Sequence, residues 1–445
     1  MQKILKTLLT AAILAIFAAC TNEPPKISTN TIFVHPMGVR IIDNNGDLWG
    51  WGRGELPINE TPTKIMSNVQ SVHNLTFATD TDNNLWTWGN WENEFFATPT
   101  MIFENVAQVH FGITSHILTK SGEMWSFHNF GDGLHMMSDV AKFYTTATGS
   151  GVFAITSDGT LYSWGRGRFL GNGLPNNEIP MRVMENVGYV AANSMVGSAF
   201  IITTDGSLYG MGENFDGQLG NGTLDRQETP QFIMGNVASV RIVGTRPNAT
   251  TFAITQDNAL YSWGSHIGLG SLEFVDMRTL TRNKPARVLE NVADLFIAEN
   301  TFFAITVDKA LWGWGANNSG QLGGAFNLGI SSGSIVPVPI MDGVSTIVMD
   351  SFGRTRYALG GGELWAWGSN SFGEVGNGAP NNLFPVPSHI MGNVVSVHFA
   401  AFSAFAITSD NELWAWGRND NGQLGDGTFI NRGVPVLIME NVRGW

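Results

Sequence analysis

The 445-residue sequence has a single cysteine, Cys20, so no intrachain disulfide can form. It also lacks positive charge, because 24 lysines and arginines stand against 37 aspartates and glutamates, giving a formal net charge of −13. Binding nucleic acid through its phosphates needs a basic surface, so this balance argues against a nucleic-acid partner. The apolar run from Leu8 to Phe17 is too short to cross a membrane as a helix.

Motifs for catalysis, cofactors and nucleotides are missing as well. No His-Glu-x-x-His or paired-cysteine motif occurs, and no nucleophile recurs beside a base, so we expect no enzyme activity. The glycine-rich bends are followed by no predicted helix and no Gly-Lys-Ser/Thr, which argues against nucleotide binding. Clusters such as residues 419–422 lack the alternating oxygen ligands and final glutamate of a calcium loop, and we predict no cofactor.

The first residues have the pattern of an export signal. Two lysines precede the apolar run, and small residues then lead to Cys20, so we assign residues 1–19 as a signal peptide and 20–30 as a flexible tether. A thiol directly after the cleavage point resembles the lipobox of bacterial lipoproteins. The resemblance implies lipid modification of Cys20 and anchoring in the cell envelope, at the outer membrane of a host with two membranes and otherwise on the outer face of the plasma membrane. A plain secretory signal with an incidental cysteine is the alternative.

A twelve-residue pattern, clearest as AITSDNELWAWG at 406–417, recurs nine times. It predicts a β-hairpin with an Asp-Asn turn, whose central residues need positive φ, and with aromatic residues at every second position of the second strand. The second strands begin at Leu48, Leu85, Met124, Leu161, Leu208, Leu260, Leu311, Leu364 and Leu413. Nine copies spaced 37 to 53 residues apart predict a repeat architecture.

The segments around each hairpin also recur in a fixed order. An Asn-Val start comes before the hairpin, and a glycine-rich bend and a Pro-x-x-Ile-Met segment follow it, which gives all-β units of three or four strands. Such units bury their faces by stacking radially. Residues 434–445 resemble the start of a unit that has no hairpin, and residues 31–52 resemble a unit that has no Asn-Val start. We therefore expect the C-terminal strand to complete the first blade. The prediction is a single closed β-propeller over residues 31–445.

The bends GENFDGQLGNGT (212–223) and GRNDNGQLGDGT (417–428) complete the pattern. With them, the chain resembles the regulator of chromosome condensation repeat family, whose units carry a hairpin, a W/Y-x-W-G strand and a G-Q-L-G bend in this order. Copies 1 to 3 have GRGELP (52–57), GNWENE and HNFGDG instead, and these shorter units look like those of a secreted β-lactamase inhibitor on the same propeller. The family usually forms seven blades, so the blade number, seven or nine, stays open.

Aromatic residues and variable segments supply the candidate contact residues. Thirteen of the fifteen tryptophans lie in the hairpin motif, and their fixed register predicts a core between blades rather than a carbohydrate platform. Trp91, with Phe95 and Phe96, lies outside that register and is a candidate binding loop. Segment 265–284 is longer than the scaffold needs, and its Arg278 and Arg282 are candidate contacts in an acidic protein, unless the segment has merely drifted.

Four histidines, His35, His73, His110 and His398, occupy one repeat position. They are weak candidates for a metal or for an anion at low pH, but equivalent side chains of neighbouring blades are usually too far apart to share a metal, and we predict no metal site.

The most consistent function is a membrane-anchored interaction module that binds a protein or glycan through propeller loops. The alternative, by similarity to the β-lactamase inhibitor, is inhibition of a secreted or periplasmic enzyme. A third hypothesis, a cell-envelope hydrolase, lacks a catalytic constellation.

Overall fold

The computed structural model describes most of the chain after residue 30. The described residues are 31–52, 59–91, 94–128, 133–147, 149–174, 176–245, 247–265, 268–270, 281–298, 300–324, 333–349, 355–380 and 383–444. Strands β1 to β36 account for all the regular structure in these ranges, which contain no helix. No helix in them is therefore long and apolar enough to span a membrane.

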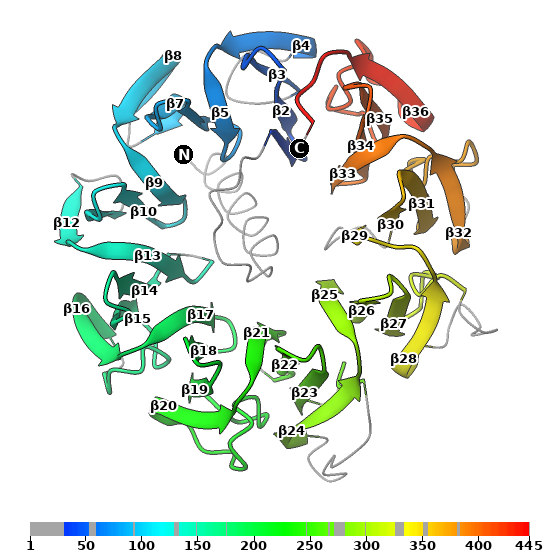
Figure 1. Ribbon diagram of the computed structural model, residues 1–445. Helices are drawn as coiled ribbons and strands as arrows, with labels where there is room; N and C mark the ends of the chain where they lie inside the picture. Colours follow the sequence, from blue (N-terminus) through cyan, green and yellow to red (C-terminus); the bar gives the residue numbers. More distant parts are fainter. Residues whose placement is uncertain are drawn as a thin grey trace, which may run out of the picture. The chain divides into compact units, whose positions relative to one another are not determined.

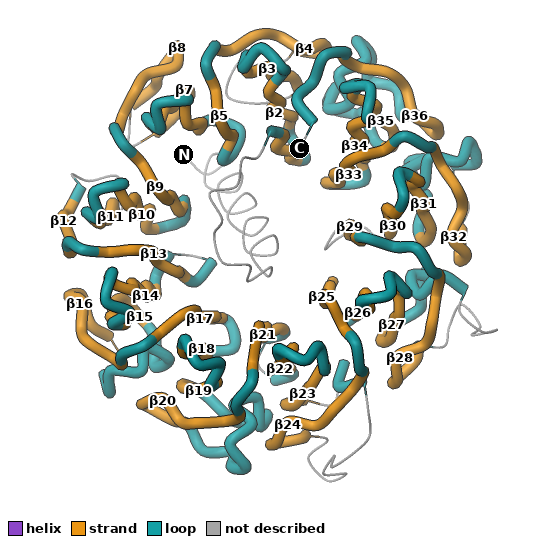
Figure 2. The backbone as a smooth tube through the Cα atoms, viewed as in Figure 1, coloured by secondary structure: helices purple, strands orange, loops and turns teal. Residues whose placement is uncertain are grey.

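The strands form nine four-stranded antiparallel sheets, each made of four consecutive strands. The predicted all-β fold of propeller blades is thus confirmed, with nine blades and with four strands even in the short early copies. Figures 1 and 2 show the strands of each blade side by side, with the loops between them in teal in Figure 2.

The described residues divide into two compact units, one within 106–294 and 335–337 and another within 31–105, 295–334 and 338–444. The first unit holds β9 (Val106–His110), β10 (Thr114–Thr119), β11 (Met124–His128), β12 (Leu134–Met137), β13 (Val140–Thr145), β14 (Gly151–Thr156), β15 (Leu161–Arg166), β16 (Asn176–Met184), β17 (Val187–Asn193), β18 (Ser198–Thr203), β19 (Leu208–Gly212), β20 (Gln227–Met234), β21 (Val237–Val243), β22 (Thr250–Thr255), β23 (Leu260–Ser265) and β24 (Thr281–Leu289).

The second unit holds the other five blades, apart from the residues of β25 and β28 assigned to the first unit. Their strands are β1 (Ile32–His35), β2 (Gly38–Ile42), β3 (Leu48–Gly52), β4 (Asn59–Met66), β5 (Val69–Val72), β6 (Phe77–Asp80), β7 (Leu85–Trp91), β8 (Glu94–Phe103), β25 (Val292–Ala298), β26 (Thr301–Thr306), β27 (Leu311–Gly315), β28 (Ser334–Met341), β29 (Thr346–Met349), β30 (Thr355–Gly360), β31 (Glu363–Gly368), β32 (Phe384–Met391), β33 (Val394–Ala400), β34 (Ser403–Thr408), β35 (Leu413–Gly417) and β36 (Arg432–Met439).

The Asn-Val starts have a backbone reason. The asparagine adopts a positive φ, for example 62° at Asn68 and 59° at Asn393, which asparagine tolerates better than most residues, and the valine after it is buried. The hairpin turn differs from the expectation, because of its two central residues only Asn411 has a positive φ. The turn runs from Thr408 to Glu412. The Thr408 N–H donates to the Glu412 carbonyl, and strand pairing starts at Ile407 and Leu413, so the turn is longer than a two-residue loop.

The C-terminal residues complete the first blade, but not through a whole strand. The strand β36 is the fourth strand of the last blade, and Asn441-Val442 after it repeats the positive-φ start. Val442 then bridges Asp43 as Val69 pairs with Asp80 in the second blade. A buried cluster that includes Ile41, Phe405 and Val442 joins the first and last blades within one unit.

The second tryptophan of the hairpin motif is buried, as predicted for a core residue. Trp51, Trp88, Trp263, Trp314, Trp367 and Trp416 are among the largest fully buried side chains. The Trp51 indole donates to the carbonyl of Gln423 in the G-Q-L-G bend of the last blade, at 2.9 Å. Gly425 of that bend must lack a side chain, since a Cβ there would lie 2.5 Å from the Trp51 Nε1 atom. The prediction was too broad for the first tryptophan of each pair, because Trp49 and Trp414, for example, are only half-buried.

Candidate functional site

The predicted aromatic contact lies on a β-hairpin rather than in a loop. Trp91 ends β7 and its backbone pairs with Glu94 at the start of β8, although the Trp91 side chain lies outside the described residues. Phe95 is 60% exposed and Phe96 is half-buried. The structure therefore presents one large aromatic side chain, Phe95, to solvent at this edge.

The prediction of Arg282 as a loop contact is wrong. Arg282 lies in β24, 1% exposed, and its Nη1 atom donates to the Ser262 hydroxyl at 3.3 Å. The Arg282 backbone pairs with Gly264 and its side chain is buried, so the residue is part of the blade. Arg278 and Cys20 lie outside the described residues.

The four histidines at one repeat position are half-buried, and burial lowers the pKa of each to about 4. They are therefore neutral at pH 7, and in the folded protein they would take up a proton only as the pH falls to about 4. Within the described ranges, no group of three or more His, Cys, Asp or Glu residues is placed to hold a metal ion. The histidine His116, at another position, is a core residue whose ring nitrogens contact Ser126 and Gly149.

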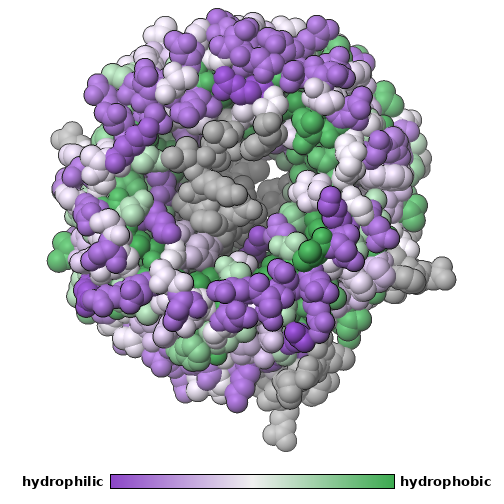
Figure 3. Space-filling model, viewed as in Figure 1, coloured by the Kyte–Doolittle hydropathy of each residue, from purple (hydrophilic) through white to green (hydrophobic). Residues whose placement is uncertain are grey.

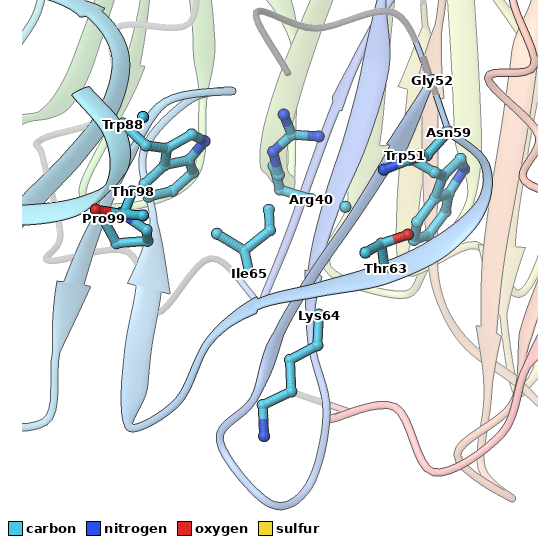
Figure 4. Close-up of a pocket in the computed structure, with 12 residues that line it drawn as sticks. Arg40, Trp51, Gly52, Asn59, Thr63, Lys64, Ile65, Trp88, Thr98 and Pro99 are labelled. Atoms are coloured by element: carbon cyan, nitrogen blue, oxygen red, sulfur yellow. The ribbon is translucent and has the colours of Figure 1, made fainter. Parts of the chain in front are cut away.

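One cavity of the second unit lies between the first and second blades, and Arg40 is among the residues that line it. We call it the Arg40 cavity; it has a volume of about 210 Å³. The residues that line it are Arg40, Gly50, Trp51, Gly52, Asn59, Thr63, Lys64, Ile65, Trp88, Ala97, Thr98 and Pro99. In Figure 4 Arg40 lies between the indole rings of Trp51 and Trp88, while the Lys64 side chain extends away from them.

Arg40 occupies a position that the other blades fill with a ring. On β2 it pairs with Gly50, the third residue of the LWGWG strand. The residues at the same register elsewhere are Phe77, His116, Phe153, Phe200, Phe252, Phe303, Tyr357 and Phe405, all buried. The first blade therefore replaces a buried ring with a buried cation.

The Arg40 side chain is 3% exposed and is held by backbone carbonyls. Its Nε atom donates to the Leu75 carbonyl and its Nη1 atom to the Val39 carbonyl, both at 2.9 Å. Burial lowers the Arg40 pKa to about 10, which still leaves the guanidinium charged at pH 7. Among the described residues no carboxylate forms an ion pair with it.

Trp88 differs from its counterparts in the same cavity. The indole N–H groups of Trp263, Trp367 and Trp416 donate to a carbonyl of the preceding blade's bend, at 2.7 to 2.9 Å. The Trp88 Nε1 atom is buried and has no hydrogen-bond partner among the residues described. The bends that supply this acceptor elsewhere read G-Q-L-G or G-E-V-G, whereas the first copy has GRGELP (52–57), of which residues 53–57 lie outside the described residues.

Sequence reasoning missed Arg40 and Trp88, although a signal was present. Aligning the nine hairpins on their LWxWG strands places Arg40 against a column of phenylalanine, tyrosine and histidine. Repeats vary most where the scaffold does not fix the residue, so a charge in a core column is a stronger signal than an arginine in a long segment.

Comparison with known proteins identifies the repeats. The regulator of chromosome condensation (RCC1) repeat matches residues 205–244, 361–407 and 410–444. The chain is 29% identical over 277 residues to the RCC1 domain-containing protein RUG3, mitochondrial, of Arabidopsis thaliana, covering 57% of this chain and 60% of the relative. Over 240 residues it is 29% identical to the ultraviolet-B receptor UVR8 of the same plant, covering 50% and 51%.

Human relatives and solved structures also match. The chain is 30% identical over 180 residues to the E3 ubiquitin-protein ligase HERC2 of Homo sapiens, covering 38% of this chain and 4% of HERC2. All three curated relatives are thus matched over less than two thirds of their length. Prp20p of Saccharomyces cerevisiae aligns with a TM-score of 0.44 at 21% identity, over 68% of this chain and 77% of that chain. Human WBSCR16 aligns with a TM-score of 0.45 at 18% identity, over 69% and 84%.

Proposed function

Because the chain belongs to the regulator of chromosome condensation repeat family, we propose that it is an interaction module that binds a partner protein and has no catalytic activity of its own. The module acts outside the cytoplasm, since the sequence begins with an export-signal pattern, and the lipid on Cys20 holds it to a membrane of the cell envelope.

Exposed apolar side chains on the outer strands carry this proposal. The fourth strand of each blade is an edge strand, which leaves one row of backbone groups open. In every blade except the first and the sixth, this strand exposes large hydrophobic side chains, which are Phe95, Met101, Leu134, Ile179, Phe232, Ile335, Val336, Val386, Val434 and Leu437. Figure 3 shows hydrophobic residues in green among hydrophilic ones along the blade edges. Exposed apolar groups on an otherwise polar surface are typical of protein-binding faces.

Charges introduced on two outer strands should weaken partner binding strongly. Ile179 on β16 and Phe232 on β20 are 67% and 58% exposed, so Ile179→Asp with Phe232→Asp should leave the fold intact. Each substitution removes an apolar side chain that would contact the partner. We expect the amount of partner recovered from the native envelope to fall roughly tenfold or more. Quantitative affinity capture followed by mass spectrometry measures this.

Thr61→Asp is the matched control, because Thr61 is exposed on β4, a strand with no exposed large apolar side chain. It should retain the partner. Equal capture by the double variant, or capture of a glycan in place of a protein, contradicts the proposal. An enzyme that is captured stoichiometrically and loses activity assigns the module as an inhibitor.

Removal of the lipid site should release the protein from membranes. In Cys20→Ser the acyl chains have no attachment point, so the protein should move from the membrane pellet to the soluble extracytoplasmic fraction. Ultracentrifugation of fractionated cells with immunoblotting measures the shift. A Cys20→Ser protein that still pellets with membranes argues against the anchor.

A further inference from the structure

We propose that β12, the outer strand of the third blade, binds the partner protein by taking an extended partner segment as a fifth strand of its sheet. The inference deepens the proposed function and rests on it, because it names one outer strand and the form in which the partner binds there. β12 lies at the edge of a sheet with the order β12-β11-β10-β9, and Figure 1 shows it on the outside of its blade. The strands β12, β16 and β20 belong to consecutive blades of one unit, so one partner can contact all three.

The first observation is a column of prolines in the outer strands. The last residue of each outer strand pairs with the first residue of the hairpin strand beside it, as Met66 pairs with Leu48. Four positions before that last residue, eight of the nine blades have a proline; these are Pro62, Pro99, Pro180, Pro230, Pro285, Pro337, Pro387 and Pro435. Proline offers no N–H and protects a sheet edge from pairing with another strand. The third blade has Gly133 at this position, so its edge lacks the protection that the other eight carry.

The second observation gives the direction of the backbone groups. Pro339 on β28 lies two positions after the proline of the column and pairs with Trp312. Prolines at alternate positions show that the sheet does not use the N–H groups there, so these groups point away from it. His135 has the register of Pro339 and pairs with Trp125. The N–H groups of Gly133 and His135 therefore both point outward, and neither donates to another described part of the backbone outside the sheet.

Gly133 also has a packing role. A Cβ at this position would lie 2.6 Å from Cε1 of Phe127, the ring that replaces the second tryptophan of the motif in this blade. This packing gives a reason for the missing proline, and the edge is unprotected all the same. Leu134 beside it is 63% exposed. Open backbone groups and an exposed apolar side chain are the two components that strand addition uses.

The repeat does not place its glycine-rich bends over this edge. In the described bends, Gln423 and Gln218 accept from Trp51 and Trp263 of the following blade, so a bend lies in the seam between blades. Phe232 on β20 has the register of His135 and is 58% exposed, although the whole bend of its blade is described. An outer strand therefore stays accessible at this register when its bend is in place.

Charge selects a basic partner segment. Glu123 contacts His135 and Ser138, and the exposed Asp139 follows β12 by two residues, so two carboxylates lie at the end of the strand. A segment that alternates apolar and polar residues and carries lysine or arginine at its end complements this edge. A second copy of the chain fits less well, because each copy has a net charge of −13 and its other outer strands carry the proline.

His135→Pro is the decisive variant, because β28 already carries Pro339 at this register. It removes an outward N–H, and we expect recovery of the partner by affinity capture from the native envelope to fall about tenfold. His135→Ala is the matched control: it also loses the imidazole and its contact with Glu123 but keeps the N–H, so it should retain more than about half of the recovery. Gly133→Pro is less suitable, since the new ring would collide with Phe127.

A synthetic peptide tests β12 without the partner. The dye-labelled peptide acetyl-KTVKVTVK-amide alternates valine with polar residues and has lysine at both ends. We expect saturable binding by fluorescence polarisation, about tenfold weaker with His135→Pro and about tenfold weaker for a peptide with proline at its fourth position. Bound peptide should also slow deuterium exchange of the amides at residues 133–137 of the wild-type protein. This readout needs no variant, so it decides the question if His135→Pro does not fold.

Two results overturn strand addition. The first is a peptide that does not bind or does not slow exchange at residues 133–137. The second is partner recovery that persists in folded His135→Pro but is lost in the Ile179→Asp, Phe232→Asp double variant, which leaves the proposed function standing. Failure of the wild-type protein to capture any protein counts against the proposed function instead, and the peptide then decides by itself whether β12 accepts a strand.

Discussion

Acidification from pH 7 to about pH 4.5 should remove several kcal/mol from the free energy of unfolding. Burial lowers the pKa of five histidines to about 4; these are His35, His73, His110, His116 and His398. In the unfolded chain the same groups have a pKa near 6.5. The unfolded state therefore binds more protons between about pH 6.5 and pH 4, and stability falls as the pH is lowered through that window.

The size of the loss follows from the same shifts. Each histidine contributes on the order of 1 to 3 kcal/mol, so the sum is comparable with the total stability of a typical domain. Carboxylates with a lowered pKa, such as Asp80 and Asp426, add to the loss only at lower pH, as the pH falls below about 4.

Urea unfolding at several pH values measures the effect, and a histidine variant isolates it. His398→Gln keeps a neutral polar group at one of these positions and should reduce the pH slope by up to about 1.4 kcal/mol per unit. A free energy of unfolding that stays flat from pH 7 to pH 4.5 would show that these rings are protonated without penalty.

Trp416→Ala should lower the free energy of unfolding by about 3 to 5 kcal/mol, because it opens a cavity between two blades. The Trp416 ring is fully buried, packs against Tyr357 at 6.1 Å between centroids, and donates to the Glu374 carbonyl at 2.9 Å.

Trp414, two residues earlier on β35, is the matched control. It has the same ring on the same strand, but it is half-buried and its indole contacts Glu412 near the turn. Trp414→Ala should cost only about 1 to 2 kcal/mol. Urea midpoints and slopes for both variants give the comparison, and equal losses would refute the inter-blade role of the second tryptophan.

Most of the fold could be predicted because the repeat displays its local rules nine times. The positive φ of Asn68 or Asn441 favours asparagine, and Gly425 must lie against an indole, so these residue types recur where the geometry does. The contribution of the C-terminal residues to the first blade could also be predicted, because the first unit, from residue 31, lacks an Asn-Val start and the C-terminal residues have one. The blade number could not be predicted, because nine hairpins stood against the seven blades usual in the family; the structure has nine blades.

The candidate sites were harder to predict, for physical reasons. Arg282 lies in a long irregular segment, and sequence irregularity does not show where strand pairing resumes; pairing resumes at Thr281 and buries the arginine. Arg40 lies in a regular strand of the hairpin motif, and the sequence interpretation of that motif was based on its tryptophans. Its significance depends on the seam between two blades, and a pattern within one repeat does not reveal what the next blade places opposite it.

The bridge from Val442 to Asp43 has a consequence for the order of assembly. The acceptor of the Trp51 indole lies 372 positions further along the chain, so the first blade lacks this contact between blades until the last blade has been synthesised. Residues 106–294, by contrast, contain four blades in one continuous stretch and can fold as they emerge. The last blade therefore stabilises the first, and the first blade gains these contacts late in folding.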